Sequence, residues 1–169
     1  MFVLVLTAVA DACPTSPSCC FVAVDAGPRA GVSINGDQWL LGGHLRIGLP
    51  CLGGLGFSHS LAVGLGGNYF TLRSSGRLDY MFWFDGAHAF GLYPTVGASA
   101  LFYGPVGGFA NFCNRVGLDE CWGHEAGWEA GGGVRYRWIG ADAVLGFEGL
   151  PVLTIMIGAW FPLTHPGDE

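Results

Sequence analysis

The tripeptide Ser58-His59-Ser60 places a possible general base between two possible hydroxyl nucleophiles. A hydrolytic pair of this kind needs the base within hydrogen-bond reach of the nucleophile. The surrounding residues alternate between apolar and small or polar, which is typical of a β-strand, and a strand sends successive side chains to opposite faces. His59 would therefore point away from both serines. We predict no catalytic residue, and lipid-modifying chemistry is only an alternative.

The chain has six cysteines that could form disulfides or bind a metal: Cys13, Cys19, Cys20, Cys51, Cys113 and Cys121. An even number is typical of chains that fold in an oxidising compartment. Metal ligation is disfavoured because no CxxC pair exists and no histidine has finger-like spacing to a cysteine. We therefore predict no metal site and no cofactor.

One disulfide can be placed by a predicted hairpin. Asn35-Gly36 is a strong signal for a two-residue turn, which would pair residues whose numbers sum to 71. Cys20 and Cys51 satisfy this sum and would face each other across two strands, close enough for a bridge. The remaining cysteines would then form two local pairs, Cys113 with Cys121 and Cys13 with Cys19.

Most charged residues of the expected strands lie on one face, together with glycine, alanine and serine. The other face is almost purely apolar and carries the large residues. Charges that are enclosed must be paired and hydrogen-bonded. We therefore predict a self-neutralised charge network, with a narrow ion path as the alternative. Its predicted members are Asp25, Arg29, His44, Arg46, Arg77, Asp79, Glu129, Arg135, Arg137, Asp142 and Glu148.

Eight alternating segments must position these charges. The expected strands are residues 21–34, 38–49, 55–71, 77–84, 88–103, 125–138, 141–148 and 152–163. The expected connections are 35–36, 50–54, 72–76, 85–87, 104–124, 139–140 and 149–151. Pro94 removes one ladder donor, so we expect a local irregularity there.

Segment 125–138 shows the alternation most clearly. It raises the question of which of its two faces is in contact with water. Glu129 and Arg135 share one face with glycines, whereas Trp128 and Tyr136 share the other. The interior of a soluble barrel is filled by bulky apolar groups. Here the small and charged residues suit a narrow interior instead, and the large apolar residues suit lipid.

The composition agrees with that interpretation. The 169 residues suggest one domain; 51% are hydrophobic and 12% charged, with a mean hydropathy of +0.44, whereas ordinary soluble domains have about 25% charged residues. No apolar run reaches the roughly 18 residues of a membrane helix. Two classes of fold are compatible with these values, a soluble protein with a deeply buried sheet and a membrane β-barrel. The net charge of −6 argues against a nucleic-acid partner.

The ends of the chain are expected to lie outside the barrel. Residues 1–12, MFVLVLTAVADA, are typical of the apolar core and cleavage region of a secretory signal, although a basic start is missing. A buried strand over residues 2–10 is the alternative. We expect a Cys/Pro/Ser linker at 13–20, the barrel at 21–163 and a tail at 164–169.

The last expected strand contains IMIGAWFPL, with Gly158, Phe161 and Leu163 in an alternating apolar setting. In this ending and in its period-two alternation the chain resembles the small eight-stranded bacterial outer-membrane β-barrels. Pro162 and the six residues after Leu163 depart from the usual ending. The resemblance implies an all-β fold, an eight-stranded antiparallel up-and-down transmembrane β-barrel in the outer membrane. It also implies outer-membrane lipids and the barrel-assembly machinery, which reads the last strand, as partners.

With both termini in the periplasm, the long loop 104–124 would lie outside the cell. It carries Phe109, Phe112 and Trp122 around the predicted Cys113–Cys121 pair, and aromatic anchors on a tethered loop suit recognition. Packing of these rings at the barrel rim is the alternative. We predict a structural or surface-interaction role through this loop. The alternatives are a narrow ion or small-solute channel, a lipid-modifying enzyme and a soluble lipocalin-like barrel.

Overall fold

The computed structural model describes residues 22–34, 37–49, 52, 54–66, 69–85, 88–107 and 123–164. The strands are β1 (Ala23–Ser33), β2 (Gln38–Leu49), β3 (Leu55–Gly66), β4 (Tyr69–Tyr80), β5 (Phe82–Trp83), β6 (Phe90–Pro105), β7 (Gly123–Tyr136), β8 (Ile139–Gly146), β9 (Leu153–Ala159) and β10 (Phe161–Pro162). The described residues include no helix with the length and apolar character needed to cross a membrane.

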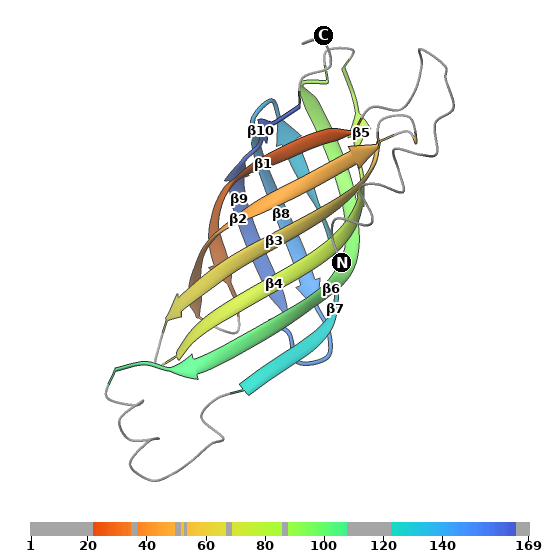
Figure 1. Ribbon diagram of the computed structural model, residues 1–169. Helices are drawn as coiled ribbons and strands as arrows, with labels where there is room; N and C mark the ends of the chain where they lie inside the picture. The colour runs from red at the N-terminus through yellow and green to blue at the C-terminus, as the bar shows by residue number, and fades with distance from the viewer. Residues whose placement is uncertain are drawn as a thin grey trace.

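These strands form one closed antiparallel barrel (Figure 1). Strands β1 to β4 and β6 to β9 pair with their neighbours in chain order, with β4 beside β6, and β1 also pairs with β9, which closes the sheet. β5 continues the path of β4, and β10 continues that of β9, so the wall consists of eight strands, two of them interrupted. The predicted eight-stranded up-and-down β-barrel is therefore confirmed.

Both interruptions lie opposite a proline, which has no N–H to donate to the ladder. Between β4 and β5 the pairing with β6 stops opposite Pro94, while on the other side the Met81 N–H continues the ladder with β3 by donating to the Gly54 carbonyl. Between β9 and β10 it stops opposite Pro28, and the Trp160 N–H donates to the Trp138 carbonyl. The irregularity expected at Pro94 is confirmed, whereas the one at Pro28 was not predicted.

The first hairpin has the predicted register. Ser33 faces Gln38 and Ala23 faces Gly48, so the paired residue numbers sum to 71 throughout. The cysteines that this register was used to pair, Cys20 and Cys51, lie outside the described residues. So do the other four, and the three disulfides stay predictions.

Two other turns differ from the sequence prediction. Gly66 pairs with Tyr69, so the connection between β3 and β4 is at 67–68 and not at 72–76. Tyr136 pairs with Ile139, so Arg137 and Trp138 form the turn that was expected at 139–140. Arg137 has a φ of +52° there, a left-handed conformation that a turn can require and a regular strand cannot.

The barrel has two distinct ends. At one, which we call the terminal end, the Val24 N–H donates to Thr164 Oγ1 at 2.9 Å, so the two ends of the described chain meet. The turn at Arg137 and Trp138 is at the same end. The other, which we call the loop end, holds the connections between β3 and β4 and between β6 and β7.

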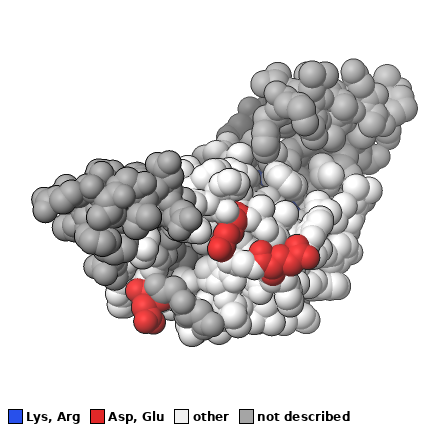
Figure 2. All heavy atoms as spheres, turned by 90° about the horizontal axis from the view of Figure 1, so that it is seen from below, with Lys and Arg blue, Asp and Glu red and all other residues white. Residues whose placement is uncertain are grey.

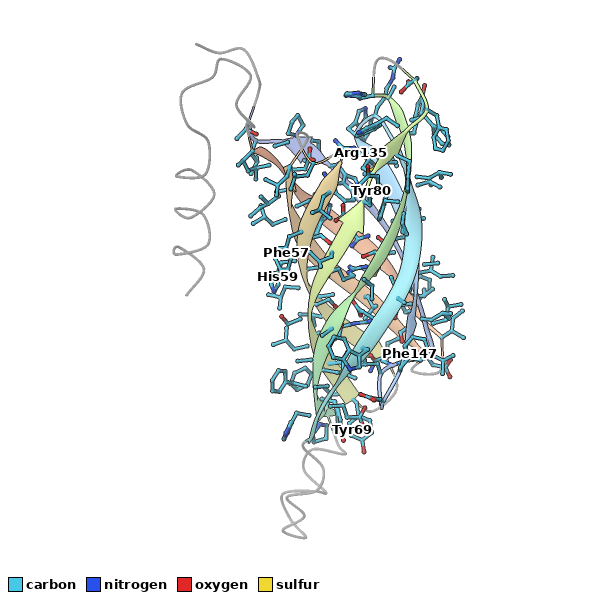
Figure 3. All side chains as sticks on the ribbon, turned by 90° about the vertical axis from the view of Figure 1, so that its right-hand side faces the viewer. Phe57, His59, Tyr69, Tyr80, Arg135 and Phe147 are labelled. Atoms are coloured by element: carbon cyan, nitrogen blue, oxygen red, sulfur yellow. The ribbon has the colours of Figure 1, made fainter. Side chains whose placement is uncertain are left out.

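The two faces of the wall follow the alternation of the sequence. Arginines, carboxylates, serines and threonines occupy the buried inward positions. Outward positions carry large apolar side chains, with Trp39 74%, Leu41 68% and Trp128 62% exposed. Figure 3 shows side chains projecting outward from the wall between the two ends, Phe57 and Phe147 among them.

Candidate functional site

The middle of the barrel interior is occupied by a group that we call the central cluster: Arg73, Ser99, Glu129 and Thr154. Arg73 Nη2 donates to Glu129 Oε2 at 2.5 Å, and Nη1 donates to Thr154 Oγ1 at 2.5 Å. The Ser99 hydroxyl donates to the same carboxylate oxygen at 2.5 Å. Because β4 neighbours only β3 and β6 over this stretch, the bonds from Arg73 to β7 and β9 cross the interior.

Arg77, two inward positions further along β4, extends these contacts toward the terminal end. Its Nε lies 3.2 Å from Glu129 Oε1, and its Nη1 lies 3.4 Å from Asp142 Oδ1 on β8. Asp142 also pairs with Arg29 of β1 and accepts a hydrogen bond from the Tyr93 hydroxyl at 3.4 Å. One carboxylate therefore joins arginines from two separate parts of the wall.

Arg46 and Asp79 form a further pair that spans β3. Arg46 Nε donates to Asp79 Oδ1 at 2.7 Å, and Nη2 donates to the Gly54 carbonyl at 3.0 Å. A Cβ added at Gly56 would come within 2.5 Å of Arg46 Nη2, and one at Gly48 within 2.7 Å of Nη1. These two glycines leave the space in which the guanidinium lies.

Nearer the terminal end, Arg135 and Asp25 form what we call the terminal pair. The two guanidinium nitrogens Nη1 and Nη2 donate to the two carboxylate oxygens at 2.9 and 3.1 Å, a bidentate arrangement. The guanidinium carbon also lies 5.1 Å from the ring centroid of Trp160. Arg135 is thus held by its ion pair with Asp25 and by the aromatic ring of Trp160.

His44 lies beside this pair without joining the ion pairs. Its ring packs on Trp160 with centroids 4.2 Å apart. Neither ring nitrogen has a hydrogen-bond partner among the described residues. The sequence placed His44 in the charge network, whereas the structure places it in an aromatic contact within the interior.

Nine of the eleven predicted network residues lie in the barrel interior. The two exceptions are Arg137 and Glu148, which are exposed at opposite ends and have φ values of +52° and +59°. Both lie in turns, where the strand alternation used to place them inside no longer applies. Their assignment to the interior is corrected accordingly.

Arg73 is the interior charge that sequence reasoning missed. The run Arg73-Ser74-Ser75-Gly76 has the composition of a turn and was assigned to one. The available signal was the alternation of Thr71, Arg73, Ser75, Arg77 and Asp79 with apolar or small residues, together with Gly67-Asn68 as a better turn.

The side chains fill most of the interior. The cavity beside Arg73 and Arg77 measures about 20 Å³, which holds about one water. Toward the terminal end, Met81, Tyr93 and Trp160 pack together and are almost fully buried. Five arginines (Arg29, Arg46, Arg73, Arg77 and Arg135) face four carboxylates (Asp25, Asp79, Glu129 and Asp142). The charges are nearly balanced within the space they share.

The predicted split of Ser58-His59-Ser60 is confirmed. Ser60 points inward, where Arg77 Nη2 donates to it at 3.2 Å, and His59 points outward. His59 instead contacts Ser74 of β4, with Nε2 and Oγ 3.1 Å apart.

The other candidate residues cannot be placed. Phe109, Phe112 and Trp122 of loop 104–124 lie outside the described residues, as does the expected signal segment 1–12. Within the described ranges, no three His, Cys, Asp or Glu side chains gather in a group that could hold a metal ion.

No protein-family model matches this sequence, and no curated protein matches it. Among solved structures, the N-terminal β-barrel domain of Pseudomonas aeruginosa OprF matches with a TM-score of 0.59 at 15% identity, over 83% of this chain and 97% of that one. Ail, the attachment invasion locus protein of Yersinia pestis, has a TM-score of 0.48 at 14% identity, over 84% of this chain and 97% of that one. The match to the OprF domain and the closed wall together show the fold of the small eight-stranded outer-membrane β-barrels.

Proposed function

We propose that the protein is a bacterial outer-membrane barrel with a closed interior and a structural or surface-interaction role. The observation that carries the proposal is the central cluster. Arg73 reaches from β4 to Glu129 on β7 and Thr154 on β9, so its side chain lies across the path an ion would take. Conduction would require breaking these charge-assisted hydrogen bonds in an interior that side chains nearly fill.

The outer wall supports a membrane location. Aliphatic side chains cover its middle, and aromatic side chains gather near both ends. Those at the terminal end include Tyr80, Phe84, Tyr136 and Trp138, and those at the loop end include Trp39, Phe70, Phe102 and Phe147. Two aromatic levels separated by an apolar band match the two interfaces of a bilayer.

The charges at the two ends support an orientation. Asp37, Glu125 and Glu148 lie at the loop end, whereas the terminal end has the exposed Arg137 beside a single turn carboxylate, Asp85, among the described residues. Figure 2 looks onto the loop end and shows separated acidic side chains there. We place this end outside the cell, where loop 104–124 would present Phe109, Phe112 and Trp122 for recognition. The end of the last strand, at Pro162, would lie on the periplasmic side, and the assembly machinery would read this strand.

Conductance tests the closed interior. Purified protein is refolded in detergent, checked for heat-modifiable migration on a gel, and added to a planar lipid bilayer. We expect migration that changes on heating and no discrete current steps. Current steps from a heat-modifiable wild type would contradict the closed interior. Solubility in water without detergent would contradict the membrane location.

The role of the loop is tested separately on whole cells. Replacing Phe109, Phe112 and Trp122 together by serine should leave the barrel heat-modifiable but reduce adhesion of expressing cells to host-cell monolayers. Unchanged adhesion by the triple variant, compared with cells that lack the protein, would count against recognition through these rings.

A further inference from the structure

The outward face carries one hydrogen-bonded polar pair in its middle, His59 on β3 and Ser74 on β4. Their Nε2 and Oγ atoms are 3.1 Å apart, and both residues lie halfway along strands of twelve residues. Away from the two ends, the other outward positions of the described strands carry apolar side chains or glycine. Figure 3 shows His59 on the outside of the wall at mid-height, beside Phe57.

A polar pair at this depth calls for a physical reason. Hydrogen-bonding side chains are costly in hydrocarbon and usually mark a functional site. The wall does not need them, because the backbone ladder between β3 and β4 is complete around them. Ester hydrolysis is a poor reason, because lipid esters lie at the interface and no described outward strand position holds a carboxylate to orient His59.

A groove adjoins the pair on the same face. Leu41, Leu45, Leu61 and Val63 form its sides, Gly43 lies in its floor, and His59 is part of its lining, around a volume of about 460 Å³. A Cβ added at Gly43 would meet only the Gly27 carbonyl, at 3.5 Å. Because Gly43 has no side chain, the groove stays open at this position. The neighbouring backbone leaves room for a Cβ, so close packing does not require a glycine here.

We propose that this groove and the His59–Ser74 pair bind one alkyl chain of a membrane lipid that carries a hydroxyl group at mid-chain. The aliphatic sides would hold the chain, and the imidazole and hydroxyl would exchange hydrogen bonds with the lipid hydroxyl. A second copy of the barrel fits less well, because a twofold contact would set one concave surface against another and leave both grooves unfilled. The inference rests on the membrane location proposed above.

The test uses the refolded full chain in detergent micelles, titrated with 12-hydroxystearate and with stearate while the methyl NMR signals of Leu45, Leu61 and Val63 are followed. We expect 12-hydroxystearate to bind about three- to tenfold more tightly, the range for one hydrogen bond in an apolar environment. The double variant His59→Leu/Ser74→Ala should bind both acids equally. Gly43→Leu, which fills the groove, should bind neither, and Ala143→Leu on β8 serves as the matched control and should behave as the wild type.

Each contrary result has its own meaning. Equal affinities in a heat-modifiable wild type, or preference that survives the double variant, would overturn the lipid site alone. If the wild type forms a dimer and Gly43→Leu dissociates it, the groove is an interface between copies and not a lipid site. If the wild type releases acid from a fatty-acid ester and Ser74→Ala does not, the His59–Ser74 pair is catalytic and the lipid site is overturned. A wild type that is not heat-modifiable would overturn the membrane location as well.

Discussion

The central cluster and the terminal pair use the same chemistry in different surroundings. Both join an arginine to a carboxylate, yet Glu129 has a side chain with no exposed surface and contacts two arginines and a serine, whereas Asp25 contacts one arginine. The central cluster connects four strands across the interior, and the terminal pair connects two. The additional contact of Arg135 is the aromatic ring of Trp160, whereas that of Arg73 is the hydroxyl of Thr154.

This difference shows what decides the contribution of a buried ion pair. Removing one partner is most costly where the other is left without water or a substitute partner. Loss of Glu129 would leave Arg73 and Arg77, whose side chains are each 7% exposed, facing each other without their shared carboxylate. Loss of Asp25 would leave Arg135, whose side chain is 11% exposed, against the aromatic ring of Trp160.

The largest expected effect is that of Glu129→Ala. We expect the free energy of unfolding to fall by about 3–5 kcal/mol, because two arginines lose their shared carboxylate. Reversible urea unfolding in lipid vesicles, followed by tryptophan fluorescence, measures it. Glu129→Gln, which keeps an acceptor for Arg73, should lose less, and equal losses would mean that charge alone matters.

Asp25→Asn should have a smaller effect. We expect a loss of about 1–2 kcal/mol, since the amide keeps one acceptor and Arg135 keeps its contact with Trp160. The same unfolding experiment applies. If the free energy of unfolding falls as much as in Glu129→Ala, the exposure of the side chains and the number of strands they connect do not explain the difference between the two regions.

Salt should separate the regions further. Between about 0.1 and 1 M NaCl, the stability difference between wild type and Asp25→Asn should shrink by a few tenths of a kcal/mol, because the terminal pair is the more exposed of the two and salt screens it more. The difference for Glu129→Ala should not change measurably. Parallel salt dependence of the two variants would contradict the difference in access to water.

The smallest effect is expected for Glu148→Gln, which serves as the control. Glu148 is exposed in a turn, so the change should stay within about 0.5 kcal/mol. A larger loss would restore the original sequence-based placement of this residue in the interior.

Period-two alternation predicted much of this arrangement. It placed Glu129 and Asp142 inside and Trp128 and His59 outside, because a strand offers each residue only two directions. It failed where the strand ended, as at Arg137 and Glu148, and where turn-forming residues lay within a strand, as at Arg73. The position of one hairpin therefore decided whether the central arginine was recognised.

The pairing of the charges could not be derived in the same way. Arg73 meets Glu129, 56 residues away, because of the tilt and stagger that close the barrel. Alternation gives the face of each residue but not its height along the axis relative to distant strands. The glycines next to Arg46 illustrate the same limit. The need for glycine at positions 48 and 56 becomes clear only when the structure shows that the guanidinium occupies the space of their side chains.

A double-mutant cycle on Arg73 and Glu129 tests the central claim most directly. The free energies of unfolding of wild type, Arg73→Ala, Glu129→Ala and the double variant give the coupling between the two side chains. We predict a coupling of about 2–3 kcal/mol, since the pair is enclosed and crosses the barrel interior. A coupling below about 0.5 kcal/mol would show that the two side chains act independently and would contradict an interior held closed by this ion pair.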